Sequence, residues 1–236
     1  GDRTDIELPA VQRELIDALH RAGKKVILVN CSGSPIGLEP ETQKCEAILQ
    51  AWYPGQQGGK AVAEVLFGDY NPAGKLPVTF YRNVSQLPDF EDYNMTGRTY
   101  RYMQDVPLFP FGYGLSYTTF GYGKTVLDKN ELTAGQSLKL TVPVTNTGKR
   151  NGEEVVQVYL RKQGDAEGPI KTLRAFKRVS IPAGKTVNVE FDLKDKELEW
   201  WDDQSNTVRV CPGNYDIMVG GSSKEEDLQR TTIAIK

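Results

Sequence analysis

Carboxylates are the side chains of this 236-residue sequence that most directly suggest chemistry. A pair of carboxyl groups is the usual equipment for cleaving a glycosidic bond. Acidic residues are frequent in the first part of the chain and include Asp2, Asp5, Glu7, Asp69, Asp89, Glu91 and Asp92. Their spacing alone singles out no pair, so the residue pattern nominates no catalytic carboxylates.

Hydrogen-bond donors and aromatic rings are concentrated in the segment RTYRY, residues 98–102. Sugars are bound by such groups, with rings against their C–H faces and fixed donors on their hydroxyls. The same composition also suits a segment that seals the interface between two domains. The two interpretations are compatible, and both stay open at this point.

A second aromatic segment is WWDD, residues 200–203. It could form a sugar-stacking or calcium-binding turn, but its acidic residues do not match an EF-hand loop. Neighbouring residues of a strand point to opposite faces, so at most one of the two tryptophans enters a core. Packing at the end of a β-sandwich is the favoured interpretation. The glycine-rich GQQGGK, residues 55–60, lacks the ending of a phosphate-binding loop and is interpreted as a tight turn before a helix.

Metal and nucleic-acid sites are disfavoured by composition. His20 is the one histidine, which excludes His-rich metal sites, and the three cysteines include no CxxC pair. We therefore predict no metal ligand and no cofactor. The formal net charge of −2 argues against a nucleic-acid partner, and no long apolar run predicts a membrane span.

Helix and strand patterns alternate in residues 1–82. Apolar residues at helical spacing predict a helix after Pro9, and the continuous apolar run at 25–30 suits a strand buried on both faces of a parallel sheet. A further apolar run, a helix and a strand are predicted at 45–53, 60–67 and 76–81. This alternation predicts an α/β layer with a small and incomplete sheet.

The rest of the chain predicts a second fold. Prolines and aromatic residues in 83–120 predict an ordered, aromatic-rich connector, since flexible linkers lack apolar anchors. In 121–236 the apolar period changes to two, and about seven short strands predict an antiparallel β-sandwich of fibronectin III or immunoglobulin type. The overall class is therefore α/β plus all-β. Pro143 lacks an N–H, so we expect its strand to lie at an edge or to be bulged there.

Four segments of the chain form a recognisable series. They are GDRTDIELPAVQ at 1–12, AWYPGQQGG at 51–59, LFGDYNPAGKLPVT at 66–79 and FPFGYGLSYT at 109–118. Together they resemble glycoside hydrolase family 3, and the last domain resembles the fibronectin-like module of that family. The resemblance covers essentially the whole chain, and it implies that residues 1–82 are the C-terminal part of the α/β sandwich domain of that family. TDIELPAVQ and RTYRY are most similar to the β-xylosidase branch, with β-glucosidases next.

The resemblance implies a retaining, exo-acting β-glycosidase. Such enzymes take an Asp nucleophile from a (β/α)₈ barrel and a Glu acid/base from the sandwich domain, and both are expected upstream of Gly1. A barrel alone needs about 250 residues, more than this chain has. We therefore expect the C-terminal portion of the enzyme, with no catalytic residue in this chain and no activity of the chain alone.

Substrate and partners also follow from the resemblance. The expected substrates of the complete enzyme are oligosaccharides or aryl glycosides, with β-xylosides ahead of β-glucosides, and the expected location is periplasmic or extracellular. Tyr100 and Arg101 are the candidate substrate-binding residues, at the substrate entrance. The alternative is a non-catalytic carbohydrate-binding or cell-surface interaction module. A severed enzyme piece would expose an apolar face or cover it by forming a homodimer.

Overall fold

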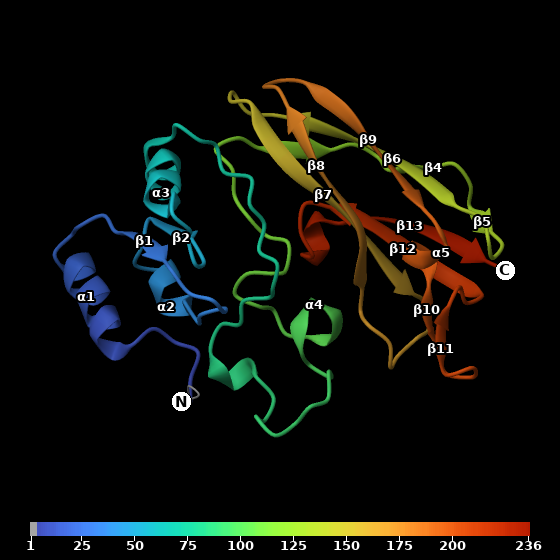
Figure 1. The fold of residues 1–236 in the computed structure, drawn as a ribbon, viewed down its shortest axis with the longest axis horizontal. Coiled ribbons are helices and arrows are strands. Elements are labelled where there is room, and N and C mark those ends of the chain that lie inside the picture. The colour runs from blue at the N-terminus through green and yellow to red at the C-terminus, as the bar shows by residue number, and fades with distance from the viewer. Residues whose placement is uncertain (1–3) are drawn as a thin grey trace. The chain divides into compact units, whose positions relative to one another are not determined.

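The computed structural model describes residues 4–236, which form two compact units (Figure 1). The first unit holds the residues up to Tyr70 together with Val78–Arg98 and Gln104–Pro110. The second holds Asn71–Pro77, Thr99–Met103 and Phe111–Lys236. The units therefore interleave along the chain, whereas the predicted domains are consecutive pieces. The GDR residues of the first motif, Gly1 to Arg3, lie outside the described residues.

The first unit is an α/β layer, as the alternating pattern predicts. Strand β1 pairs with β2 in parallel, with Ile27 opposite Ala47. Helix α3 ends at Gly68, whose φ of +80° is the left-handed conformation that glycine adopts readily. The elements are α1 (Ala10–Arg21), β1 (Ile27–Asn30), α2 (Glu39–Thr42), β2 (Ala47–Gln50), α3 (Gly58–Phe67) and the 3₁₀ turn η1 (Val84–Gln86).

Two predictions for this unit are wrong. The strand expected at 76–81 is absent, and only an isolated bridge between Phe80 and Phe109 forms there. Leu76 instead donates its N–H to Tyr113 and belongs to the second unit. Burial of β1 on both faces is also not observed, because Ile27 is 52% exposed. The two-stranded sheet leaves this strand with one neighbour among the described residues.

The second unit is a β-sandwich, as the period of two predicts. One sheet has the order β5-β13-β12-β7-β8, and the other has β6 at its centre, paired with β3, β4 and β9. The strands are β3 (Phe120–Tyr122), β4 (Val126–Leu127), β5 (Glu131–Leu132), β6 (Leu138–Asn146), β7 (Gly152–Lys162), β8 (Thr172–Ile181), β9 (Thr186–Leu193), β10 (Trp200–Asp202), β11 (Thr207–Arg209), β12 (Gly213–Gly220) and β13 (Gln229–Ile235). The short helices are α4 (Thr99–Tyr102) and α5 (Asp195–Leu198), and η2 (Glu225–Asp227) is a 3₁₀ turn.

Alternating side chains of the two sheets form the core of the sandwich. Leu138, Leu140 and Val142 of β6 are buried in one cluster with Val156 and Val158 of β7. Burial of each such side chain contributes roughly 1.5–3 kcal/mol relative to exposure. This core is what holds the loops and short helices of the second unit in place.

Pro143 does not lie in an edge strand, but the predicted irregularity is present, because residues 123–125 lie opposite residues 142–143 and so form a bulge of one extra residue beside it. The pairing of β6 with β9 runs without a shift from Leu138 to Thr145. On the other side, β3 pairs with residues 144–146 and β4 with 140–141. Pro143 falls between these two short strands, and its carbonyl accepts a hydrogen bond from Gly123 N at 2.7 Å. A proline is tolerated there because the ladder is interrupted on the side that its missing N–H faces.

No helix of residues 4–236 has the length and apolar character needed to cross a membrane.

Candidate functional site

Tyr100 holds helix α4 in the second unit. Its ring stacks on Phe111 with centroids 4.3 Å apart, and Tyr159 meets it edge-on at 5.8 Å. Its hydroxyl accepts a hydrogen bond from Leu173 N at 3.1 Å. Burial raises the pKa of Tyr100, so the phenol stays neutral. The structure thus places this candidate residue in a packed aromatic cluster, where it positions its neighbours.

Arg101, the second candidate residue, has a side-chain nitrogen that is left unpaired in the described part of the chain. The Nε of its guanidinium is buried and has no hydrogen-bond partner among residues 4–236. Its carbon Cζ lies 5.5 Å from the centre of the Tyr102 ring. The backbone is anchored, since Ile170 N donates to the Arg101 carbonyl at 2.6 Å. The side chain is therefore oriented, but this donor is unsatisfied.

Two residues of β8 extend this cluster, and the sequence analysis missed both. Arg174 donates to the Glu199 carbonyl at 2.5 Å and lies over the Trp200 ring at 5.7 Å. Burial lowers the pKa of Arg174, and the positive charge of Arg101 lowers it further. Thr172 contributes a buried hydroxyl without a hydrogen-bond partner. A basic residue in a strand is an ordinary surface feature, so the pattern alone gave no signal for Arg174.

Backbone strain marks the start of α4. Thr99 has a φ of +58°, a region that β-branched residues rarely enter. Such conformations cost on the order of 1–3 kcal/mol and persist where the surroundings fix them. Here the Thr99 carbonyl accepts from Met103 N at 2.9 Å, and its hydroxyl accepts from Arg101 N at 3.3 Å. Strain and unsatisfied donors therefore occur within the same short helix.

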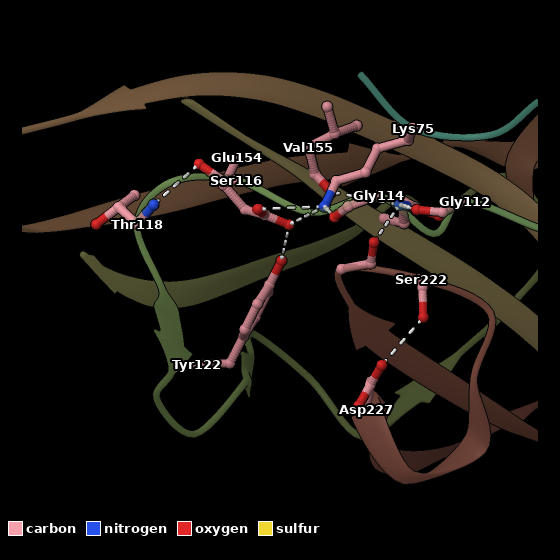
Figure 2. A network of polar contacts seen from close by, with 12 residues as sticks. Lys75, Gly112, Gly114, Ser116, Thr118, Tyr122, Glu154, Val155, Ser222 and Asp227 are labelled. Atoms are coloured by element: carbon pink, nitrogen blue, oxygen red, sulfur yellow. Dashed lines mark hydrogen bonds and ion pairs between the residues drawn. The ribbon is translucent and has the colours of Figure 1, made fainter. Parts of the chain in front are cut away.

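A buried carboxylate forms the centre of a second polar cluster. Figure 2 shows Lys75 and Tyr122 converging on Glu154, a residue of β7 that is 4% exposed. The Tyr122 hydroxyl donates to Oε1 at 3.0 Å, and Lys75 Nζ lies 3.3 Å from the same oxygen. Lys75 Nζ also donates to the Gly114 carbonyl at 3.1 Å. Glu154 lies on the same face of β7 as the buried valines. A charged residue at an inward-facing position of the strand is the feature of the sequence that could have revealed this cluster.

Burial decides the protonation behaviour of this cluster. Desolvation raises the pKa of Glu154, against the opposing effects of Lys75 and the Tyr122 hydrogen bond. Burial and the neighbouring Glu154 also raise the pKa of Tyr122. A carboxyl of raised pKa could act as a general acid. Glu154 is enclosed by its own partners, however, and its contacts are those of a structural ion pair.

Every carboxylate that is buried in the described part of the chain has a basic partner. They are Glu41 with Arg13, Glu154 with Lys75 and Asp216 with Arg230, at N–O distances of 2.9, 3.3 and 3.6 Å. A retaining glycosidase instead places two carboxyl groups about 5 Å apart across the bond it cleaves. Residues 4–236 also contain no group of three or more His, Cys, Asp or Glu placed to hold a metal ion. None of these carboxylates is arranged as a catalytic pair.

The first unit contains an apolar cavity of about 420 Å³. Its lining comes from β2, the turn that follows it and helix α3, and includes Leu49, Pro54, Gln57 and Val65. None of its lining residues is titratable, so the cavity offers no acid–base chemistry. The turn precedes a helix, as predicted.

The two tryptophans separate as strand alternation predicts. Trp200 is buried at 2% exposure and donates to Asp165 at 2.6 Å, whereas Trp201 is 49% exposed and donates to Asp203 at 2.8 Å. Asp202 is engaged by Arg209 at 2.6 Å. The acidic residues of the turn are thus occupied by protein donors. The three cysteines are free, with Cys31 exposed.

Comparison with protein families matches most of the chain. Residues 1–117 match the glycosyl hydrolase family 3 C-terminal domain. Residues 154–223 match the fibronectin type III-like domain. The two matches correspond in order to the α/β and β-sandwich folds described above.

Curated relatives match all or nearly all of the chain. It is 58% identical to a xylan 1,4-β-xylosidase from Xylanibacter ruminicola over 235 residues, which is 100% of this chain and 27% of that protein. It is 43% identical to a β-xylosidase from Formosa agariphila, with 100% of this chain and 33% of that protein covered. A periplasmic β-glucosidase from Salmonella typhimurium is 39% identical, over 94% of this chain and 31% of its own length. The chain therefore spans about a third or less of these relatives.

Solved structures of β-glucosidases also match the whole chain and are longer than it. A β-glucosidase from Erythrobacter marinus superposes with a TM-score of 0.87 at 42% identity, covering 100% of this chain and 31% of that one. A β-glucosidase from Listeria innocua in complex with glucose has a TM-score of 0.86 at 30% identity, covering 100% and 34%.

Proposed function

Because the chain belongs to glycosyl hydrolase family 3 and carries its C-terminal domain and a fibronectin type III-like domain, we propose that it is the C-terminal portion of a retaining, exo-acting β-glycosidase. The reaction is hydrolysis of O-glycosyl bonds, with β-xylosides preferred over β-glucosides. The observation that carries the preference is the 58% identity to a xylan 1,4-β-xylosidase over the whole chain.

We place the two catalytic carboxyl groups outside these residues. In the complete enzyme an Asp attacks the anomeric carbon, and a Glu protonates the leaving oxygen and later activates water. The pairing of Glu41, Glu154 and Asp216 with basic side chains supports the view that none of them serves as either group. This chain contributes part of the sandwich sheet and the β-domain.

Tyr100 and Arg101 are proposed to belong to the substrate entrance of the complete enzyme. Arg101 is the residue that would contact the ligand, because the buried Nε of its guanidinium has no hydrogen-bond partner in the described residues. Tyr100 acts as a positioning residue through Phe111 and Tyr159.

The full-length protein tests the proposal. Purified enzyme should hydrolyse aryl β-xyloside with a kcat/KM roughly tenfold or more above that for aryl β-glucoside, since small differences in a sugar are discriminated to about that extent. NMR during turnover should detect β-xylose before mutarotation. Release of the α-anomer first would contradict a retaining mechanism, and preference for β-glucoside would overturn the assigned substrate.

The 236-residue chain tests the location of the catalytic pair. Aryl β-xyloside should not be hydrolysed above the buffer blank by the chain alone. Turnover of the substrate would disprove the claim that the two carboxyl groups lie elsewhere. A full-length protein that binds oligosaccharides saturably but hydrolyses none of them would establish the alternative, a non-catalytic carbohydrate-binding module.

A further inference from the structure

We propose that Arg101 of α4, together with Thr172 and Arg174 of β8, forms a binding site for the carboxylate of an acidic sugar. The inference rests on the proposed function only for the sugar character of the ligand. Recognition of the carboxylate is argued from this chain alone.

Unsatisfied polar atoms single out this place. The buried side-chain nitrogen and oxygen atoms that lack a hydrogen-bond partner in residues 4–236 are Arg101 Nε, Thr172 Oγ1 and Arg174 Nε. All three belong to the second unit, to α4 and the beginning of β8. Buried donors are almost always paired in folded proteins, so three orphans in one cluster indicate a missing acceptor.

The positive charges of the two arginines indicate that the missing acceptor is an anion. Arg101 and Arg174 are close enough to repel one another, and each also acts on the Tyr100 hydroxyl. Glu197 and Glu199 offset part of the charge of Arg174, but neither forms an ion pair with it in the described residues. An anion would relieve this repulsion, whereas a neutral ligand would leave it in place.

The fixed orientation of the two guanidinium groups favours a planar anion. Tyr102 and Trp200 each support one arginine through a ring face. The Arg174 guanidinium is held further by the Glu199 carbonyl. A guanidinium held in place presents its donors as a fork, which matches a carboxylate in two parallel hydrogen bonds. The hydroxyl of Thr172 would remain as a donor or acceptor for a sugar oxygen.

The strained backbone supports a binding function over simple packing. Thr99 is held at a φ of +58° immediately before Tyr100 and Arg101. Strain of this kind accumulates at ligand-binding positions, where an element must hold one geometry. A helix needed only for packing could begin with glycine or asparagine there at lower cost.

The test is a titration of the folded 236-residue chain by NMR and calorimetry. The probes are D-glucuronate, D-glucose and acetate at matched ionic strength. Glucuronate should bind saturably and more tightly than acetate, and glucose should bind much more weakly. Loss of a charged hydrogen-bonded partner should reduce glucuronate affinity roughly tenfold or more in R101A and R174A.

Matched variants separate recognition from folding. R101K keeps the charge but loses the fork, so it should bind between the wild type and R101A. R178A removes an arginine of the same strand that already pairs with Glu153, and it should bind like the wild type. Circular dichroism and cooperative thermal unfolding establish that each variant is folded.

Three outcomes would overturn the proposal. They are the absence of saturable glucuronate binding, acetate binding as tightly as glucuronate, and glucuronate binding that R101A and R101K leave unchanged. These binding measurements involve no turnover. Failure here therefore leaves the proposed hydrolysis intact, and loss of hydrolysis by the full-length enzyme leaves the binding result intact.

Discussion

A buried carboxylate such as Glu154 is retained in a β-sandwich only where donors replace the water it has lost. Lys75 supplies an ammonium group and Tyr122 a hydroxyl, and both are directed at the same carboxyl oxygen. Removing one partner of such a pair is strongly destabilising, because the other charge stays buried. The three side chains should therefore be treated as one interacting network.

The first prediction concerns the pH dependence of E154Q. Burial raises the pKa of Glu154 above its ordinary value of 4.5, so its contribution to folding is greatest below that value and is lost as pH rises through the folded-state pKa. Glutamine stays neutral throughout. The free energy of unfolding of E154Q minus that of the wild type should therefore increase from acid to neutral pH, as measured by urea denaturation.

D202N provides a contrast of opposite sign. Hydrogen bonds from Ser205 and Arg209 lower the pKa of Asp202 to about 2, so its contribution is present at neutral pH and is lost in acid. D202N should lower the free energy of unfolding relative to the wild type most at neutral pH, and this loss should shrink as pH falls. If the difference in free energy of unfolding between E154Q and the wild type does not change across this pH range, the raised pKa of Glu154 is contradicted.

Residue-level prediction from the sequence succeeded where the signal was local. The alternation of a strand is enough to send Trp200 inward and Trp201 outward. The same alternation places Glu154 on the inner face, but it does not identify Lys75 as its partner, because the two are 79 residues apart. Arg174 was missed for the same reason. A missing hydrogen-bond partner is a property of the folded neighbourhood and leaves no trace in the pattern.

At the scale of elements, the ends of helices are set by single residues. Helix α3 stops at Gly68, where φ is +80° and the amide donates to the Val65 carbonyl at 3.1 Å. A side chain with a Cβ is disfavoured in this conformation by roughly 1–2 kcal/mol.

The second prediction follows for G68A. It should lower the free energy of unfolding of the first unit by about 1 kcal/mol, since the strain is partly offset by reduced entropy of the unfolded chain. Urea unfolding followed by circular dichroism and by amide exchange of α3 measures the change. G55A is the control, because a Cβ there meets no atom within 4 Å and the backbone has no positive φ. Equal effects of G68A and G55A would refute the role of the cap.

Helices and strands could be predicted where the apolar period of a segment and the glycine or proline residues that end it agree within a few residues. Helices α1 and α3 and the long strands of the sandwich meet this condition. The segment at 76–81 has strand-like composition, yet its partner is chosen by the tertiary fold. In the second unit, Leu76 N donates to the Tyr113 carbonyl, and the Leu76 carbonyl accepts from Gly112 N.

At the scale of the whole molecule, the two units differ in how completely they bury apolar side chains. The sandwich encloses a continuous core from both sheets. In the described part of the first unit, the large apolar side chains that are buried are Ile16, Ile36, Leu38 and Phe80. Helix α1 accordingly exposes one apolar stripe, with Val11 at 71%, Leu15 at 61% and Leu19 at 37% exposure. These residues follow the spacing of one helix face.

The third prediction is that the 236-residue chain forms a homodimer through this stripe of α1. Removing apolar surface from water is favourable by roughly 25 cal/mol per Å², so an exposed stripe favours self-association. Sedimentation equilibrium should show a mean mass that rises with protein concentration. L15K places a charge at the centre of the stripe and should keep the chain monomeric, whereas K24A, near the end of α1, should not. A wild type that stays monomeric at high concentration, or an L15K variant that still associates, would show that α1 is not the contact and that the apolar face stays in water.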